Sequence, residues 1–218
     1  MRINELTNEE IQEYIKDYKL IIDARPTDAF VNGYLKGAIN IILNEHFDAR
    51  ANYFSELHNE VLIIAQEDHL NDLKELVGDN LKKKVIGVLT QNFETWQKNN
   101  LPLDMIINVD SYELKLDIQH DDKAIVLDVR TDIQYNDEHV VGAVNMQMND
   151  FRDPAKIGLL DENSNLYLHC NGGTRSVLLT SVLKRNGFHN VRNIEGGFKA
   201  VLADGNIPLT SNNKKSQN

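Results

Sequence analysis

The sequence predicts an α/β protein of two tandem domains, each a small parallel sheet flanked by helices. Residues 20–44 and 125–149 align without gaps at an offset of 105 residues, which carries Asp23 onto Asp128. Each copy alternates short apolar runs with amphipathic segments, a pattern typical of strands buried on both faces of a parallel sheet. A repeat of this length is the size of a domain, so each copy is expected to form its own core.

Local patterns place the elements of the first copy. Thr7 opens the capping-box pattern Thr-Asn-Glu-Glu, which predicts the start of a helix before the first strand. The register of the repeat continues downstream, with residues 61–65 lying on 166–170. Residues 97–108 are expected to connect the two copies, with Pro102 near the boundary. Trp96 is interpreted as core packing. The expected boundaries are a first domain at 1–103, a second domain at 104–211 and a flexible tail at 212–218.

The second copy is expected to contain strands and a helix that position one cysteine. Cys170, the only cysteine in 218 residues, directly follows an apolar run, at the carboxyl end of a predicted strand. This is where open α/β sheets place their ligands. The strands are predicted at residues 125–127, 144–146, 166–169 and 191–194, and the helix at 177–185, with Gly187 placed to end it.

Composition limits the choice of partners and location. The net charge of −10 argues against nucleic acid and anionic membranes, because both need a basic surface. No apolar stretch approaches the roughly 18 residues of a spanning helix, and the first residues are too polar and acidic for a signal peptide. A single cysteine cannot form an intramolecular disulfide, and a free thiol suits a reducing compartment. A cytoplasmic location is therefore expected.

The segment Cys-Asn-Gly-Gly-Thr-Arg-Ser, residues 170–176, carries the chemistry of the second copy. Gly172 and Gly173 are expected to let the backbone curl so that N–H groups point inward, and the following helix adds the positive end of its dipole. With the charge of Arg175 nearby, the pKa of Cys170 should fall below the usual value of about 8.5. An isolated cysteine is more often a small core side chain, but this arrangement favours a nucleophile.

Three ordered motifs resemble those of the rhodanese (sulfurtransferase) family. "VLDVRTDIQYNDEHVVGAVNM" is similar to the opening signature of the family, "CNGGTRS" to its active-site loop, and "NIEGGFKAVLADGNIPL" to its closing Gly-Gly segment. The loop and the closing segment resemble especially the rhodanese region of bacterial persulfide dioxygenase–rhodanese fusion proteins. With its repeat, the chain is identified as a tandem rhodanese.

The resemblance implies sulfur transfer through Cys170. The thiolate would accept sulfane sulfur from thiosulfate or a low-molecular-weight persulfide as Cys–S–S⁻ and pass it to a thiol or cyanide. No metal or organic cofactor is required, because the cysteine itself is the carrier. The partners would be a small-molecule sulfur donor and a thiol acceptor, with a sulfide-oxidation protein as a further candidate. The substrate-binding residues would be Asn171, Gly172, Gly173, Thr174, Arg175 and Ser176.

Other functions can be built on the same loop. A cysteine phosphatase or arsenate reductase is disfavoured, because enzymes of that type place five residues between Cys and Arg, and here four separate Cys170 from Arg175. A module that binds or senses persulfide without turnover, or a component of a sulfide-oxidation system, would use the same residues. Steady-state turnover distinguishes these from an enzyme.

Four residues outside the loop are expected to support it. Asp128 and Arg130 are interpreted as a structural ion pair, because Asp23 and Arg25 repeat the pattern in the first copy. A close backbone approach beneath the loop is expected at two further positions, Gly196 and Gly197.

The histidines are not expected to be catalytic or to bind metal. His139 is interpreted as a structural hydrogen-bonding residue. His169 should point to the opposite side of its strand from Cys170, so no catalytic role is assigned to it. The seven histidines show no metal-ligand spacing, and one cysteine cannot build a thiolate cluster.

The first copy has lost the catalytic features. Ala65 stands where Cys170 stands, and Leu70 stands where Arg175 stands. Acidic residues replace the loop glycines and would repel anionic donors. This copy is therefore expected to be non-catalytic, and the family resemblance implies that it walls the substrate cleft or docks a partner. The remaining replacements, at the loop and at the closing glycines, are Glu67, Asp68, Gln91 and Asn92.

Overall fold

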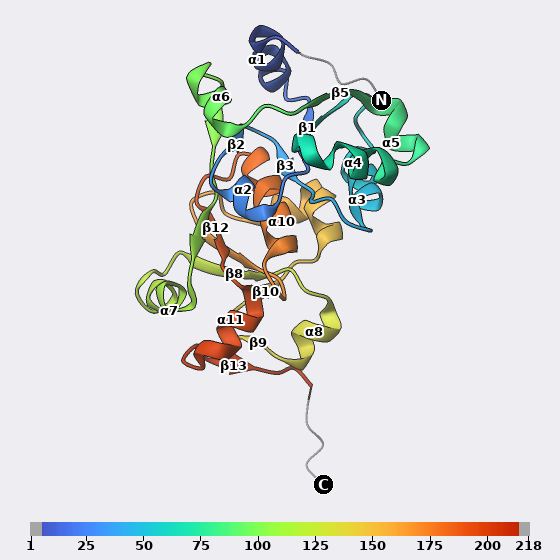
Figure 1. The fold of residues 1–218 in the computed structure, drawn as a ribbon. Helices are drawn as coiled ribbons and strands as arrows, with labels where there is room; N and C mark the ends of the chain where they lie inside the picture. Colours follow the sequence, from blue (N-terminus) through green and yellow to red (C-terminus); the bar gives the residue numbers. More distant parts are fainter. Residues whose placement is uncertain (1–5, 214–218) are drawn as a thin grey trace. The chain divides into compact units, whose positions relative to one another are not determined.

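The computed structural model describes residues 6–213, which form two compact units divided between Met105 and Ile106 (Figure 1). The first unit contains α1 (Asn8–Lys16), β1 (Leu20–Asp23), α2 (Thr27–Val31), β2 (Tyr34–Leu35), β3 (Ile39–Asn40), α3 (Phe47–Phe54), β4 (Val61–Ile64), the 3-10 helix η1 (Glu67–His69), α4 (Leu70–Leu76), α5 (Asp79–Lys84), β5 (Val85–Leu89), α6 (Phe93–Lys98) and β6 (Leu103–Asp104).

Within the described residues the second unit follows a similar order with three differences: it begins with the additional strand β7, it has η2 and α9 where the first has α3, and it has the single helix α10 where the first has η1, α4 and α5. Its elements are β7 (Ile107–Val109), α7 (Ser111–His120), β8 (Ala124–Asp128), α8 (Asp132–Asp137), β9 (His139–Val140), β10 (Val144–Asn145), the 3-10 helix η2 (Met148–Arg152), α9 (Pro154–Ile157), β11 (Asn165–His169), α10 (Thr174–Arg185), β12 (Val191–Ile194), α11 (Gly197–Asp204) and β13 (Leu209–Thr210).

Both units are α/β folds built on a parallel sheet, as the sequence predicts. The strand order is β3-β1-β4-β5 in the first unit and β10-β8-β11-β12-β7 in the second. The pairing of Asp23 with Asn40 recurs as Asp128 with Asn145, at the offset of the sequence repeat. A short antiparallel pair also recurs, as β2–β6 and β9–β13. The duplication is therefore confirmed at the level of strand register.

The sheet of the second unit is covered on both faces. Val126 and Tyr167 are neighbours in register and pack with Leu114 of α7 and Phe198 of α11 in one apolar cluster. On the opposite face α10 lies against β11 and β12, and Figure 1 shows α10 on the other side of β8 from α7 and α11. Strands buried on both faces explain why their sequences read as continuous apolar runs.

Helix starts agree with the sequence in one case and differ in another. The predicted capping box is present, because the Thr7 side chain accepts a hydrogen bond from the Glu10 N–H at 3.2 Å and the Glu10 carboxylate accepts one from the Thr7 N–H. By contrast, α10 begins at Thr174, three residues before the predicted start at Val177. The apolar periodicity starts only at Val177, whereas Gly173 already turns the chain into the helix.

The predicted connection at 97–108 contains structure that the sequence did not indicate. β6 and most of β7 lie within it, and β7 forms the edge of the second sheet beside β12. Three residues are too short for a recognisable alternation, so this edge strand depends on tertiary pairing.

A buried ion pair fixes the end of β1. The Arg25 guanidinium donates to both oxygens of Asp23, at 2.6 Å for the shortest contact, and also to the Gly33 carbonyl at 2.9 Å. The Arg25 guanidinium lies 4.8 Å from the centre of the Trp96 ring, and Trp96 is fully buried, as predicted. The pair thus joins the end of β1 to the segment that follows α2 and to Trp96 of α6.

Replacing Asp23 with Asn should destabilise the first unit, because it leaves the Arg25 guanidinium buried without its counter-charge. The expected loss in free energy of unfolding is about 3–5 kcal/mol, measured by urea denaturation. The matched control is Asp28→Asn, an exposed carboxylate on α2, for which a change of about 0.5 kcal/mol or less is expected. An equal loss in free energy of unfolding for the two variants would show that the buried ion pair stabilises the unit no more than an exposed carboxylate does.

Candidate active site

Cys170 lies at the carboxyl end of β11, between the strand and α10. β11 pairs with β8 on one side and β12 on the other, so the cysteine follows a central strand. Its side chain is buried, with 2% of its surface exposed. The predicted place of the cysteine, in a strand-to-helix turn of a parallel sheet, is thus the observed one.

The sulfur of Cys170 is surrounded by hydrogen-bond donors of its own loop. The Gly173 N–H donates to Sγ at 3.1 Å. The Ser176 hydroxyl lies 3.7 Å from Sγ and 2.8 Å from the Gly173 carbonyl oxygen. A hydroxyl has one hydrogen, so Ser176 either donates to that carbonyl and closes the turn, or donates to the sulfur.

These donors determine the protonation of the thiol. Burial alone would raise the pKa of Cys170, but hydrogen bonds from the backbone of Ser176 and Gly172, from the Ser176 hydroxyl and from the backbone of Gly173 outweigh it. The result is a pKa below the ordinary thiol value. Fixed N–H dipoles at the start of α10, where the first N–H groups have no partner within the helix, thus favour the thiolate form of the buried sulfur more than in an ordinary thiol.

Of the two loop glycines only one is required by the backbone. Gly173 has φ of 100° and precedes the first turn of α10, a conformation that side chains rarely adopt. Gly172 lies outside the left-handed region, and a Cβ there would meet no atom within 4 Å. A positive φ therefore makes glycine necessary at position 173 and not at 172, while the backbone N–H groups of both residues hydrogen-bond to the sulfur.

The start of α11 forms the floor of the loop. Gly196 and Gly197 have φ of 69° and 62°, and a Cβ on Gly197 would lie 2.5 Å from the Cys170 carbonyl oxygen. That oxygen accepts a hydrogen bond from the Phe198 N–H at 2.8 Å. The close approach to the backbone of Cys170 is thus present at Gly197, whereas a Cβ on Gly196 would meet Ala200 of the same helix at 2.9 Å.

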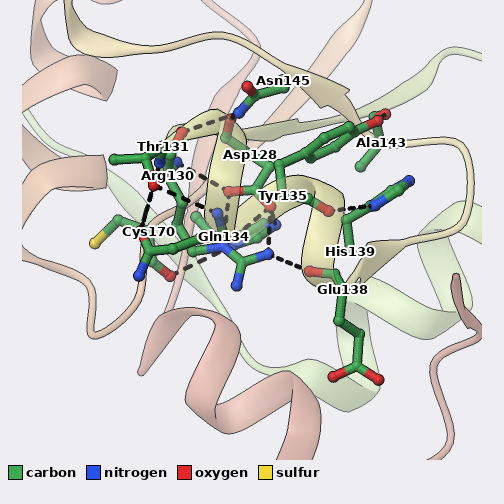
Figure 2. A network of polar contacts seen from close by, with 11 residues as sticks. Asp128, Arg130, Thr131, Gln134, Tyr135, Glu138, His139, Ala143, Asn145 and Cys170 are labelled. Atoms are coloured by element: carbon green, nitrogen blue, oxygen red, sulfur yellow. Dashed lines mark hydrogen bonds and ion pairs between the residues drawn. The ribbon is translucent and has the colours of Figure 1, made fainter. Parts of the chain in front are cut away.

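The ion pair expected of Asp128 and Arg130 lies behind the loop (Figure 2). The Arg130 guanidinium contacts the Asp128 carboxylate at 2.6 Å, donates to the Glu138 carbonyl at 2.6 Å, and lies 3.6 Å from the centre of the Phe198 ring. Figure 2 shows the sulfur of Cys170 pointing away from this network. The pair therefore supports the backbone around the site and does not contact the sulfur.

His169 is a buried neighbour of the site whose environment the sequence did not reveal. Its Nε2 lies 3.7 Å from an oxygen of Asp128, and its ring stacks on Phe198 with 5.6 Å between centres. Burial, first of all, lowers the pKa of His169. One feature of the sequence could have indicated the burial of His169, because the equivalent residue in the first copy is the apolar Ile64. His139, which the sequence analysis interprets as a structural hydrogen-bonding residue, contacts the Tyr135 carbonyl oxygen through Nδ1 at 2.7 Å.

Arg175 provides a positive charge at the site. It is half-buried in the first turn of α10, and within residues 6–213 its guanidinium has no ion pair or hydrogen bond. The groups that lower the pKa of Cys170 are the loop N–H groups and the Ser176 hydroxyl. Arg175 is thus available for an anionic ligand. The two remaining loop residues, Asn171 and Thr174, are half-buried.

The first unit carries no nucleophile at this position. Ala65 follows β4 and is buried, and the chain continues into η1 and not directly into a long helix. Across residues 6–213 no group of three His, Cys, Asp or Glu side chains could hold a metal ion. In the same described range, every helix is too short or too polar to cross a membrane.

Comparison with known proteins identifies the family. The rhodanese-like domain matches the chain twice, at residues 7–99 and 111–204. The chain belongs to the rhodanese family. Thiosulfate sulfurtransferase PspE of Escherichia coli is 32% identical over 75 residues, which cover 34% of this chain and 71% of that protein. The tRNA uridine(34) hydroxylase of Buchnera aphidicola is 29% identical over 119 residues, or 50% of this chain and 38% of that protein.

Solved rhodanese structures are also similar. The rhodanese-like domain of an Anabaena protein has a TM-score of 0.46 and 27% identity, over 52% of this chain and 86% of that domain. The two successive family matches show that the rhodanese-like domain occurs twice in this chain, which spans only 38% of the length of the Buchnera relative.

The lowered pKa of Cys170 should be visible in its alkylation. In the wild type the rate of reaction with iodoacetamide should reach its plateau at a lower pH than for an ordinary thiol, because the thiolate is the nucleophile. Ser176→Ala removes the hydroxyl donor and should move the profile back towards higher pH. Ser181→Ala, a buried serine farther along α10, serves as the control and should leave it unchanged. An unshifted profile for Ser176→Ala would contradict the assigned role of the hydroxyl.

Proposed function

We propose that the second unit is a sulfurtransferase that works through a persulfide on Cys170. The observation that carries the proposal is a buried sulfur held by loop N–H donors, with an unpaired Arg175 in the same helical turn. Membership of the rhodanese family and the similarity to a protein named thiosulfate sulfurtransferase support it.

The reaction is a double displacement. The Cys170 thiolate attacks the sulfane sulfur of the donor, a new S–S bond forms, and the old S–S bond breaks with its electron pair leaving on sulfite or on a thiolate. The enzyme then carries Cys–S–S⁻. An acceptor thiolate or cyanide attacks the outer sulfur, takes it as a persulfide or thiocyanate, and regenerates the Cys170 thiolate.

The loop stabilises the negative charge in both states. N–H groups of Gly172, Gly173 and Ser176 act on the inner sulfur, and the start of α10 is available to the outer one. Arg175 draws in the anionic donor. Asn171 and Thr174 complete the ring as its remaining members. In this proposal the backbone N–H groups stabilise the sulfur of Cys170, and the Arg175 guanidinium binds the sulfur donor.

The preferred donor is a low-molecular-weight persulfide or thiosulfate. The resemblance of the loop and closing segment to the rhodanese region of persulfide dioxygenase fusions supports the persulfide and a place in sulfide oxidation, next to a partner protein. A thiol that must stay reduced between turnovers fits a cytoplasmic setting. The first unit is non-catalytic in this proposal, because Ala65 replaces the nucleophile.

Intact-protein mass spectrometry tests the persulfide directly. Incubation with thiosulfate, or separately with glutathione persulfide, should add one sulfur atom to the wild type, and added thiol or cyanide should remove it. Cys170→Ser should gain none, because the chain has no other cysteine. If the wild type takes up no sulfur from either donor, the proposed reaction is excluded.

The floor of the loop offers a second test. Gly197→Ala should lower sulfur-transfer turnover at least about tenfold, because the new Cβ would meet the Cys170 carbonyl oxygen. The matched control is Gly205→Ala at the other end of α11, where φ is also positive, at 70°, but the space is open. It should lose about 1 kcal/mol of stability and keep its turnover. Equal turnover in both variants would contradict the role assigned to Gly197.

A further inference from the structure

The first unit contains a cavity at the position that Cys170 occupies in the second. Its volume is about 350 Å³, and all of its lining residues belong to the first unit. Ala65 and Gln66, which follow β4, form one part of the wall, and Gln91, Asn92 and Phe93, which follow β5, form another. The cavity therefore lies at the carboxyl edge of the sheet, where α/β folds take ligands.

The cavity exists because the closing glycines have been replaced. In the second unit Gly196 and Gly197 bring the Phe198 N–H to the Cys170 carbonyl at 2.8 Å. Asn92 stands at the position of Gly197, has φ of −91°, and caps α6 by accepting a hydrogen bond from the Thr95 N–H at 3.0 Å. Among the described residues the backbone of Phe93 makes no corresponding bond to Ala65. The helix therefore stands off from the loop.

A glycine at position 33 leaves room for the ring of Phe93. The Phe93 ring lies against Gly33, where a Cβ would come within 2.1 Å of the ring. The equivalent position in the second unit is Glu138, which has a side chain. A glycine is thus required at 33 by the position that Phe93 adopts. The first unit therefore differs from the second in a matched pair of wall residues, Gly33 and Phe93, and not only in having Ala65 in place of a cysteine.

One acceptor and one donor on the cavity wall lack a hydrogen-bond partner within residues 6–213. The Gln91 Oε1 atom is buried and has no hydrogen-bond partner in residues 6–213. Buried polar atoms are nearly always partnered, so this one calls for a ligand donor or a bound water. Nε and Nη2 of Arg25 bind Asp23 and Gly33, while its Nη1 makes no bond within the same range. Nη1 can therefore donate to a ligand acceptor.

Charge selects the class of ligand. The guanidinium of Arg25 is neutralised by Asp23 at 2.6 Å, and the other ionisable group on the wall is the carboxylate of Glu94. An anion such as thiosulfate therefore finds no free positive charge. Phe93 adds an aromatic wall beside the amide of Gln91, which suits a flat molecule.

We propose that the first unit binds a neutral, planar small molecule that carries an N–H donor next to a carbonyl acceptor, as nicotinamide and uracil do. The N–H would donate to Gln91 Oε1, and the carbonyl would accept from Arg25 Nη1. Binding requires no sulfur chemistry and is independent of Cys170.

Saturation-transfer NMR on the full chain, with nicotinamide and its carboxylate analogue nicotinate as probes, tests the proposal. Nicotinamide should bind with a dissociation constant of about 1 mM, and nicotinate at least about tenfold more weakly. Gln91→Met removes the acceptor and should weaken nicotinamide about tenfold. Ala29→Leu, on another part of the wall, should occlude the cavity and abolish binding without touching Gln91. Both variants are checked for folding by circular dichroism.

The Cys170→Ser variant separates ligand binding by the first unit from sulfur transfer by the second. Cys170→Ser should bind nicotinamide as the wild type does, and loss of binding in that variant would overturn the proposal by placing the probe at the catalytic loop. Equal affinity for nicotinate would overturn the ligand class. No binding of nicotinamide or uracil at about 10 mM would overturn the site itself.

Discussion

The hydrogen bond from the Phe198 N–H to the Cys170 carbonyl is the constraint on which the catalytic loop depends. It is possible only because Gly197 carries no side chain and adopts a positive φ. The bond fixes the carbonyl of the cysteine, and this holds the first peptide of the loop while Gly173 turns the chain into α10. In the first unit the same contact is absent among the described residues, and a cavity takes its place. One pair of glycines thus separates a closed sulfur site from an open pocket.

The aspartate–arginine pair is a frame that both units keep. In each unit the arginine binds the carboxylate two residues before it and a carbonyl eight residues after it, at 2.9 Å in one unit and 2.6 Å in the other. An asparagine amide closes the same turn in both, donating to the carbonyls of the pair. A feature present in the silent copy cannot be specific to catalysis. The pair therefore supports the fold of both units, whether or not a cysteine follows the neighbouring strand.

The repeat and its apolar runs predict most of this fold, because strands buried on both faces leave an unmistakable pattern. The positions of Cys170 after a strand and of Arg175 at the start of the following helix could also be predicted, because the apolar run, the glycines and the helical periodicity are all local in the sequence. Other features could not. β7 is too short to show a period, and the true requirement at Gly172 and Gly173 depends on backbone angles. The burial of His169 depends on what packs against its face, and the cavity depends on the bond to the Ala65 carbonyl that the Phe93 N–H does not make.

A buried thiolate needs neutralisation that does not depend on a mobile side chain. Cys170 has 2% of its surface exposed, and fixed N–H groups at 3.1 Å and nearby supply this without loss of side-chain entropy. Arg175 lies apart from this arrangement and is half-buried. A persulfide extends the negative charge by one sulfur atom beyond the inner position. A guanidinium bound to a thiolate of Cys170 would compete with an anionic donor, so an arginine without an ion pair among the described residues suits the proposed alternation between a thiolate and a persulfide.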